Sequence, residues 1–453
     1  GGSIENRSRF LVEVIQASRA AVDDEIPIWC RLDAREYRTP DGIEFADCQA
    51  TARLAQEAGA AAIHLSAYGD ATSASAFTEG TLPHTEAKHA DLSAQLKADL
   101  RVPVIGVGRI RPEVGEQMIA EGKADLIAMG RQMLADPETA KKLVEQRPDD
   151  IRPCINCYVC VASPFFDRRV GCAVNPVLSN EVELAGTDRT SASSSKRVVV
   201  VGGGPAGMEA ARVAASRGHA VTLFEASAQL GGALRFAALV YEPNRRLLSW
   251  LSRQMTSLGV DVRLGTPATP ALLASLQPDA IIVATGGARE RSTIPGADQS
   301  HVVDGDDLRK VLTGSGDGDA KKIPFVGRLA ATAGRTLRLT EDPDRLAKLT
   351  KYYMPVGKRV AVIGGGLVGI EMAEFLVERG RTVTVLEAGP TMAVEMAHPR
   401  RWRVLTDLRD HGSELLTDAT VTRIDADAVH YERPDGTSAS VDADTVVIAT
   451  GLV

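Results

Sequence analysis

The sequence of 453 residues has no long hydrophobic run and no excess of basic residues. No apolar run approaches the roughly 20 residues that cross a bilayer, which argues against a membrane partner. The formal net charge is −7 and no basic stripe is present, which argues against nucleic acid as a partner. The first residues have neither the basic nor the apolar region of a secretory signal, so we expect a cytoplasmic protein in a reducing compartment.

Histidine is also scarce: the eight histidines are scattered, and no Ser-His-Asp triad or metal-hydrolase motif is evident. The sequence therefore indicates no catalytic proton donor, and the catalytic residues stay unknown. The chain begins without Met and stops within a buried-strand pattern at residues 445–451, so we expect a fragment of a longer protein. Length alone predicts about three domains and leaves open whether the protein forms a homo-oligomer.

Cysteine is rare but concentrated. Four of the six cysteines lie close together, at Cys154, Cys157, Cys160 and Cys172. Three thiolates separated by two residues each, with a fourth further on, can hold an iron–sulfur cluster. Structural zinc more often takes two separated Cys or His pairs, and disulfides are disfavoured in a reducing compartment. We therefore interpret residues 154–185 as a 4Fe-4S cluster segment, with zinc or structural thiols as the alternatives.

Helical and strand patterns alternate through residues 1–153, which predicts an α/β fold. Strands are expected at residues 28–32, 61–66, 102–107 and 124–129, and helices at 9–22, 45–58, 91–100 and 137–146. Four βα units in a row predict a parallel sheet, and a closed eight-stranded barrel would need four more units. Cys30 and Cys48 stand alone in these elements and are interpreted as small packed hydrophobes.

The first region resembles the old yellow enzyme family of FMN-binding (β/α)8 barrels in segments 1–10, 107–110 and 128–137. The resemblance implies the C-terminal half of such a barrel. It implies that Arg7 lies beside the flavin pyrimidine, with a surface ion pair as the alternative. Loops after the last two strands form phosphate sites in such barrels, and the FMN-phosphate candidates there are Gly108, Arg109, Gly130 and Arg131. Arg31 and Tyr68 are expected either to line the substrate pocket or to serve packing.

The second half of the chain contains two copies of one dinucleotide-binding unit. The first copy has Gly202, Gly204 and Gly207 after a strand pattern, and Glu225 at the end of the next strand. The second copy has Gly364, Gly366 and Gly369, with Glu387 at the matching place. The glycines allow a pyrophosphate to approach the helix N-terminus, and the carboxylate accepts from a ribose hydroxyl.

The two copies resemble flavoprotein reductases of the glutathione reductase type. The resemblance implies FAD in residues 197–300, with Gly232 contributing, and NAD(P)H in residues 357–453. Glu387 favours NADH over NADPH. Residues 186–196 are rich in serine and predict a linker, whereas residues 301–356 form a long connection with helical patterns such as 345–349.

Barrel, cysteine segment and two dinucleotide units in this order resemble the group of 2,4-dienoyl-CoA reductase and trimethylamine dehydrogenase. The resemblance implies an enzyme that passes electrons from NAD(P)H through FAD and a 4Fe-4S cluster to FMN, which reduces a small unsaturated substrate. The Cys-x2-Cys-x2-Cys spacing of this chain looks more like that of the amine dehydrogenases. Oxidative N-demethylation therefore stays open, as does a reductase component that delivers electrons to a protein partner.

Overall fold

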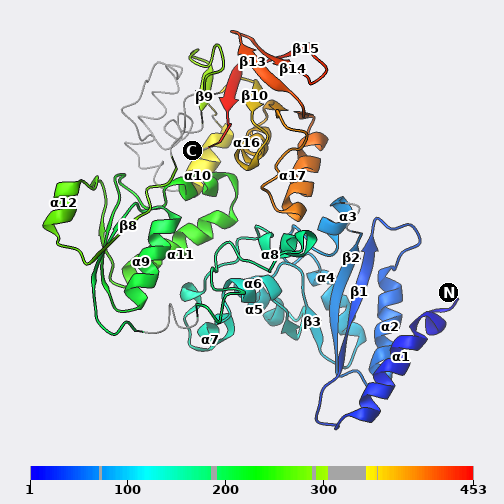
Figure 1. Cartoon of the computed structure of the whole chain (residues 1–453). Coiled ribbons are helices and arrows are strands. Elements are labelled where there is room, and N and C mark those ends of the chain that lie inside the picture. The colour runs from blue at the N-terminus through cyan, green and yellow to red at the C-terminus, as the bar shows by residue number, and fades with distance from the viewer. Residues whose placement is uncertain are drawn as a thin grey trace. The chain divides into compact units, whose positions relative to one another are not determined.

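The computed structural model describes residues 2–70, 74–184, 191–287, 292–304, 343–352, 354 and 356–451. The chain divides into two compact units, residues 1–134 and 135–453, shown in Figure 1. Part of the expected linker 186–196 and most of the connection 301–356 lie outside the described residues. Within the described ranges, no helix has the length and apolar character needed to span a membrane.

The first unit is a four-stranded parallel sheet in the order β1-β2-β3-β4 with helices between the strands. Its elements are α1 (Ile4–Ala21), β1 (Trp29–Tyr37), α2 (Phe45–Glu57), β2 (Ala62–Gly69), α3 (Ala74–Glu79), α4 (Ala90–Asp99), β3 (Val104–Gly106), α5 (Pro112–Ala120), β4 (Leu126–Ile127) and α6 (Gly130–Ala135). Ile63, Leu65, Leu96 and Val104 are buried in its core. The predicted run of four βα units is therefore confirmed.

Several boundaries in this unit differ from the prediction, and two of the differences have a cause in the structure. Helix α1 begins at Ile4 rather than at residue 9, because the Ser3 side chain accepts a hydrogen bond from the Asn6 N–H and caps the helix. Strand β1 extends beyond the predicted 28–32 to Tyr37, across a register shift between Asp33 and Glu36. Such an irregularity breaks the alternation by which strands are read from sequence.

The second unit begins with short helices, two before the cysteine segment and two within it. These are α7 (Thr139–Val144), η1 (Pro148–Asp150), α8 (Val159–Ala162) and η2 (Ser163–Phe166). The buried Asp136 carboxylate accepts hydrogen bonds from the Lys142 ammonium at 2.7 Å and from the Arg152 N–H at 2.8 Å. These two bonds fix the entry of the chain into the cysteine segment.

The first dinucleotide-binding copy forms a parallel sheet in the order β7-β6-β5-β8. Its elements are β5 (Arg197–Val201), α9 (Pro205–Ser216), β6 (Ala220–Phe224), α10 (Ala233–Val240), α11 (Pro243–Ser257), β7 (Asp261–Arg263), α12 (Pro270–Ser275) and β8 (Ala280–Val283). Strands β5 and β6 have the bounds that were predicted for the two strands of the strand–glycine–helix–strand pattern. Val200, Met208, Leu223 and Met255 are buried between the sheet and its helices.

The second copy forms a five-stranded parallel sheet in the order β12-β11-β10-β16-β9, beside an antiparallel meander β13-β14-β15. Its elements are β9 (Val302–Asp304), α15 (Pro343–Tyr352), β10 (Arg359–Ile363), α16 (Leu367–Val377), β11 (Thr382–Leu386), α17 (His398–Asp410), β12 (Glu414–Leu416), β13 (Thr420–Ile424), β14 (Ala428–Glu432), β15 (Ser438–Asp442) and β16 (Thr445–Ile448). Helix α15 confirms the predicted helix at 345–349. Strand β9 was not predicted.

Candidate functional site

Both glycine motifs form the same tight turn between a strand and a helix. Gly202 and Gly364 have φ of +109° and +103°, a conformation that glycine adopts without strain. A Cβ on Gly207 would collide with the Gly202 carbonyl oxygen, and a Cβ on Gly369 with the Gly364 carbonyl oxygen. The first and third glycines of each copy are therefore required by the backbone itself.

The two predicted acids occupy equivalent positions in the two copies. Glu225 accepts hydrogen bonds from the backbone N–H groups of Gly203 at 2.7 Å and Ser227 at 2.8 Å. Glu387 accepts from Gly365 at 2.6 Å and Gly389 at 2.8 Å. Each carboxylate thus holds the middle of its glycine loop and is directed toward the edge of the sheet where a ribose would lie.

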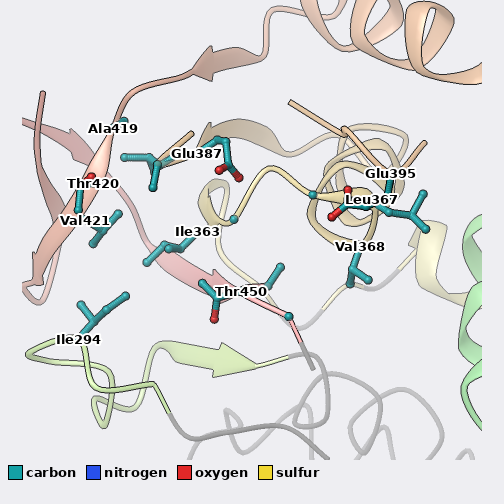
Figure 2. Close-up of a pocket in the computed structure, with 16 residues that line it drawn as sticks. Ile294, Ile363, Leu367, Val368, Glu387, Glu395, Ala419, Thr420, Val421 and Thr450 are labelled. Atoms are coloured by element: carbon teal, nitrogen blue, oxygen red, sulfur yellow. The ribbon is translucent and has the colours of Figure 1, made fainter. Parts of the chain in front are cut away.

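A pocket of about 520 Å³ opens at the carboxyl ends of the second sheet. It is lined by the ends of β10, β11 and β16, including Ile363, Glu387 and Thr450, by the start of α16, and by Thr420 and Val421 of β13. Ligands of open α/β sheets bind outside the carboxyl ends of the strands. We call this pocket the nucleotide pocket; Figure 2 shows its side chains.

Sequence reasoning missed the second carboxylate of the nucleotide pocket. The Glu395 carboxylate accepts a hydrogen bond of 3.1 Å from the Leu367 N–H, the first residue of α16. Figure 2 shows Glu395 beside Leu367 and Glu387 farther from Leu367, at the end of β11. An alignment of the two copies would have marked Glu395 as a difference between them, because the matching position of the first copy is Ala233.

In the first copy, Gly232 lies against the glycine motif, and its contact with FAD stays a prediction. Its φ is +48°, and a Cβ there would lie 3.1 Å from the Gly204 Cα. Gly204 itself faces open space, since among the described residues a Cβ on it would meet no atom within 4 Å. This opening lies at the N-terminus of α9, where a pyrophosphate would bind.

The four clustered cysteines lie in one tightly wound segment. Asn156 and Tyr158 adopt left-handed conformations with φ of 50° and 62°, which turn the chain sharply between the first three cysteines. Burial raises the pKa of the Cys157 thiol, backbone hydrogen bonds from Val159 and Ala173 lower it, and the neighbouring Cys154 and Cys172 raise it. Cys172 and its neighbour Ala173 therefore lie near Cys157 despite their distance along the chain.

This donor set fits an iron–sulfur cluster. Four thiols gather in one segment, and backbone N–H groups point at the sulfurs, including the Asn156 N–H at 3.4 Å from the Cys154 Sγ; such hydrogen bonds tune cluster potentials. None of the six cysteines, all of which the structure describes, forms a disulfide. Across the described ranges, no three His, Cys, Asp or Glu side chains converge closely enough for a single metal ion. The cluster assignment stays a prediction.

One buried tyrosine connects the cysteine segment to both dinucleotide-binding copies. The Tyr241 hydroxyl, at the end of α10, donates a hydrogen bond of 3.0 Å to the Asn156 carbonyl oxygen. The Arg400 guanidinium lies over the Tyr241 ring, 3.8 Å from its centroid. Arg400 in turn donates to Glu371 at 3.1 Å and to Glu374 at 3.2 Å, both on α16. Helix α16, which begins at the nucleotide pocket, thereby reaches the cysteine segment.

Two partly buried acids, Glu371 and Glu374, share this one arginine, and their surroundings shift their pKa values. Arg400 is only 4% exposed. Burial raises the pKa of Glu374 to about 7 against the attraction of Arg400, and burial likewise raises the pKa of Glu371. A single guanidinium does not fully offset the desolvation of two partly buried carboxylates, so the pKa of each acid stays above its usual value.

We expect the stability of the second unit to fall as pH rises through about 7. The folded-state pKa of Glu374 is raised, so its stabilising contribution is complete below the unfolded value near 4.5 and is lost as pH rises through the folded value. The slope is at most about 1.4 kcal/mol per pH unit for one proton. The measurement is the thermal midpoint between about pH 5 and about pH 8.5, for the wild type and for Glu374→Gln. Parallel curves for the two proteins would contradict the assignment.

In the first unit, the structure places the predicted FMN residues with partners from their own unit. Arg7 is exposed and pairs with Asp47 at 2.6 Å, which is the surface ion pair given as the alternative. The Arg109 guanidinium donates to the His84 carbonyl oxygen. Gly108 has φ of +119°. Gly130 begins α6, which includes Arg131. Their role toward FMN stays a prediction.

The two substrate-pocket candidates of the first unit differ in their surroundings. The Arg31 guanidinium donates a hydrogen bond of 2.6 Å to the Ser66 hydroxyl of the neighbouring strand. The Tyr68 side chain is 43% exposed. Arg31 therefore has the packing partner that the alternative interpretation expected, whereas the exposed Tyr68 remains a candidate for contact with a substrate.

Two family models match the chain. Residues 196–453, more than half of it, match the family described as pyridine nucleotide-disulphide oxidoreductase, and residues 1–150 match the NADH:flavin oxidoreductase / NADH oxidase family. The NADH oxidase of Thermoanaerobacter brockii is 34% identical over the whole of this chain, which spans 64% of that protein. An N,N-dimethylglycine/sarcosine dehydrogenase of Chromohalobacter salexigens is 35% identical over 65% of this chain and 43% of that protein.

Several solved structures are similar over the full chain. The complex of 2-naphthoyl-CoA reductase with 2-naphthoyl-CoA has a TM-score of 0.82 and 28% identity, covering 100% of this chain and 62% of that one. The chain therefore spans less than two thirds of the length of these relatives.

Proposed function

Because the chain belongs to the pyridine nucleotide-disulphide oxidoreductase family, we propose that it forms the electron-transferring part of an NAD(P)H-dependent flavin oxidoreductase. Electrons would pass from NAD(P)H through FAD and a 4Fe-4S cluster to FMN. The observation that carries the proposal is the duplication: two equivalent glycine loops with matching acids stand in one compact unit with four clustered cysteines.

The residues divide by cofactor in this proposal. The first copy binds FAD through its glycine motif and carboxylate, namely Gly202, Gly204, Gly207, Glu225 and Gly232. The second copy binds NAD(P)H through Gly364, Gly366, Gly369 and Glu387. The cysteines Cys154, Cys157, Cys160 and Cys172 hold the cluster, and Arg7, Gly108, Arg109, Gly130 and Arg131 bind FMN. The flavins supply two-electron storage, and the cluster supplies single-electron transfer between them.

The nucleotide pocket supports NADH rather than NADPH as the electron donor. Glu387 suits a ribose 2′-hydroxyl, whereas the 2′-phosphate of NADPH calls for an arginine. The described residues that line the pocket include two carboxylates, Glu387 and Glu395, and neither Lys nor Arg.

The substrate we propose is a small molecule with an activated C=C bond, such as an enoyl thioester. The similarity to 2-naphthoyl-CoA reductase and to an NADH oxidase supports the reductive direction. The similarity to an N,N-dimethylglycine/sarcosine dehydrogenase supports oxidative N-demethylation as the second candidate. We propose a cytoplasmic location and no membrane or nucleic-acid partner.

Replacing Cys157 with serine is expected to remove the cluster and to separate the two flavins electronically. Serine is a poor substitute for a thiolate ligand of iron, so iron should fall from about four per chain toward zero, while FAD should still be reduced by NADH. FMN reduction by NADH should be lost. The measurements are the iron, sulfide, FMN and FAD contents of the full-length, anaerobically purified protein, and a NADH titration followed by visible absorbance.

Cys30→Ala is the matched control, since Cys30 lies on β1 outside the cysteine segment. It should keep iron and both flavin reductions. Zinc in place of iron in the wild type would contradict the cluster. Bound cofactors that NADH does not reduce would contradict the reductase and favour methylated amines as substrates.

A further inference from the structure

A carboxylate occupies the place in the second copy where the dinucleotide pyrophosphate is expected. The pyrophosphate of a bound dinucleotide lies at the helix N-terminus behind the glycine motif. There, Glu395 accepts the Leu367 N–H at 3.1 Å, and its Oε1 lies 3.3 Å from the position of a Cβ on Gly366. Two anions cannot share one donor, so pyrophosphate binding requires Glu395 to move away. Its side chain is exposed, so it can turn into solvent.

The first copy has the same loop without this carboxylate. The Gly231 N–H donates to the Gly203 carbonyl oxygen at 2.8 Å, and the Ala393 N–H donates to the Gly365 carbonyl oxygen at 2.6 Å. Gly231 and Ala393 each lie six positions after the acid of their copy, and two positions later stand Ala233 and Glu395 respectively.

The surroundings of the middle glycine match as well. In the first copy, the atom nearest to the position of a Cβ on Gly203 belongs to the Leu230 side chain. In the second copy, the atom nearest to a Cβ on Gly365 belongs to the Met392 side chain. The loops are therefore equivalent residue by residue, and the acid is confined to one of them.

We propose that Glu395 is a competing anion that weakens pyrophosphate binding in the second copy and so speeds release of the nicotinamide dinucleotide. This inference rests on the proposed function, in which the first copy keeps FAD bound while the second exchanges its dinucleotide at every turnover. Between turnovers the Glu395 carboxylate accepts a hydrogen bond from the Leu367 N–H at the N-terminus of α16, where the helix dipole stabilises a negative charge. When a dinucleotide binds, the charge of Glu395 remains at the edge of the pocket and repels the phosphates.

The test compares Glu395→Ala and Glu395→Gln with the wild type, each as the full chain with FAD bound. Calorimetric titration with ADP and with NADH should show about tenfold tighter binding to Glu395→Ala, equivalent to about 1.4 kcal/mol. Stopped-flow measurement should place most of the change in the dissociation rate. Glu395→Gln keeps an acceptor for the Leu367 N–H but loses the charge, so a smaller tightening is expected. Adenosine, which lacks the pyrophosphate, should bind all three proteins equally.

The reciprocal variant is Ala233→Glu, which installs the acid in the first copy. Ala233 is exposed at the start of α10, so the longer side chain has room. The purified variant should contain less FAD than the wild type. Full FAD retention in Ala233→Glu would overturn the proposal, as would equal or weaker ADP binding by Glu395→Ala.

The outcomes also separate this inference from the proposed function. A wild type that binds ADP but whose FAD is not reduced by NADH would contradict the proposed electron donor, and the ADP comparison would still decide the role of Glu395. If adenosine binding changed in parallel with ADP binding, the effect would not act through the pyrophosphate, and the inference would be wrong. Absence of ADP binding in all three proteins would overturn both.

Discussion

Gly369→Ala is expected to abolish most NADH binding while leaving FAD in place, and Gly207→Ala is expected to do the reverse. In each case the new methyl group would collide with a backbone carbonyl oxygen, that of Gly364 or of Gly202. No flexible side chain can yield, so the helix start must move away from its strand. Overpacking of this kind costs about 1–3 kcal/mol, equivalent to about 10- to 100-fold in a dissociation constant.

The two variants serve as controls for each other, because the same substitution is made at equivalent positions of two copies. FAD content after purification and NADH affinity by titration are the measurements. Retention of the other nucleotide in each variant shows that the second unit still folds. Loss of FAD from Gly369→Ala, or loss of NADH binding alone from Gly207→Ala, would reverse the assignment of the two copies.

The glycine motifs were predictable because their physics is local. A buried strand, a turn that only glycine can form and a helix follow one another within a few residues, and Glu225 and Glu387 stand where the next strands end. The structure confirms these elements and the four βα units before them. Cys154 and Cys172 both act on the pKa of Cys157, and two left-handed residues turn the chain between the first three cysteines, but the role of the four cysteines as cluster ligands stays a prediction.

Other features could not be predicted because they depend on residues far apart in the sequence. Strand β9 has three residues and forms the edge of a sheet built from strands much later in the chain, so no periodicity marks it. Arg400 stands beside Arg401 in the sequence, where nothing marks it as buried, yet it is buried against Tyr241. Arg7 had two interpretations from the sequence, and only the structure revealed its partner, Asp47.

The buried arginine leads to the second large effect: Arg400→Met should strongly destabilise the second unit. The variant leaves Glu371 and Glu374 buried without a counter-charge and removes the cation over the Tyr241 ring. Breaking a buried ion pair by removing one partner costs about 3–5 kcal/mol, which corresponds to a thermal midpoint lower by roughly 5–10 °C. The Tyr241 hydrogen bond to Asn156 should weaken with it, and iron should be lost more readily from the cysteine segment.

The pH dependence distinguishes charge from packing as the cause. Without Arg400, both carboxylates are neutral at low pH and must ionise in a buried site as pH rises, so the destabilisation should be larger at about pH 8 than at about pH 6. The triple variant Arg400→Met, Glu371→Gln, Glu374→Gln removes the charges together and should recover most of the loss, since an uncharged cluster of similar volume is often as stable as the ion pair. A triple variant as unstable as Arg400→Met, with no pH dependence in either, would mean that Arg400 acts by packing on Tyr241 alone.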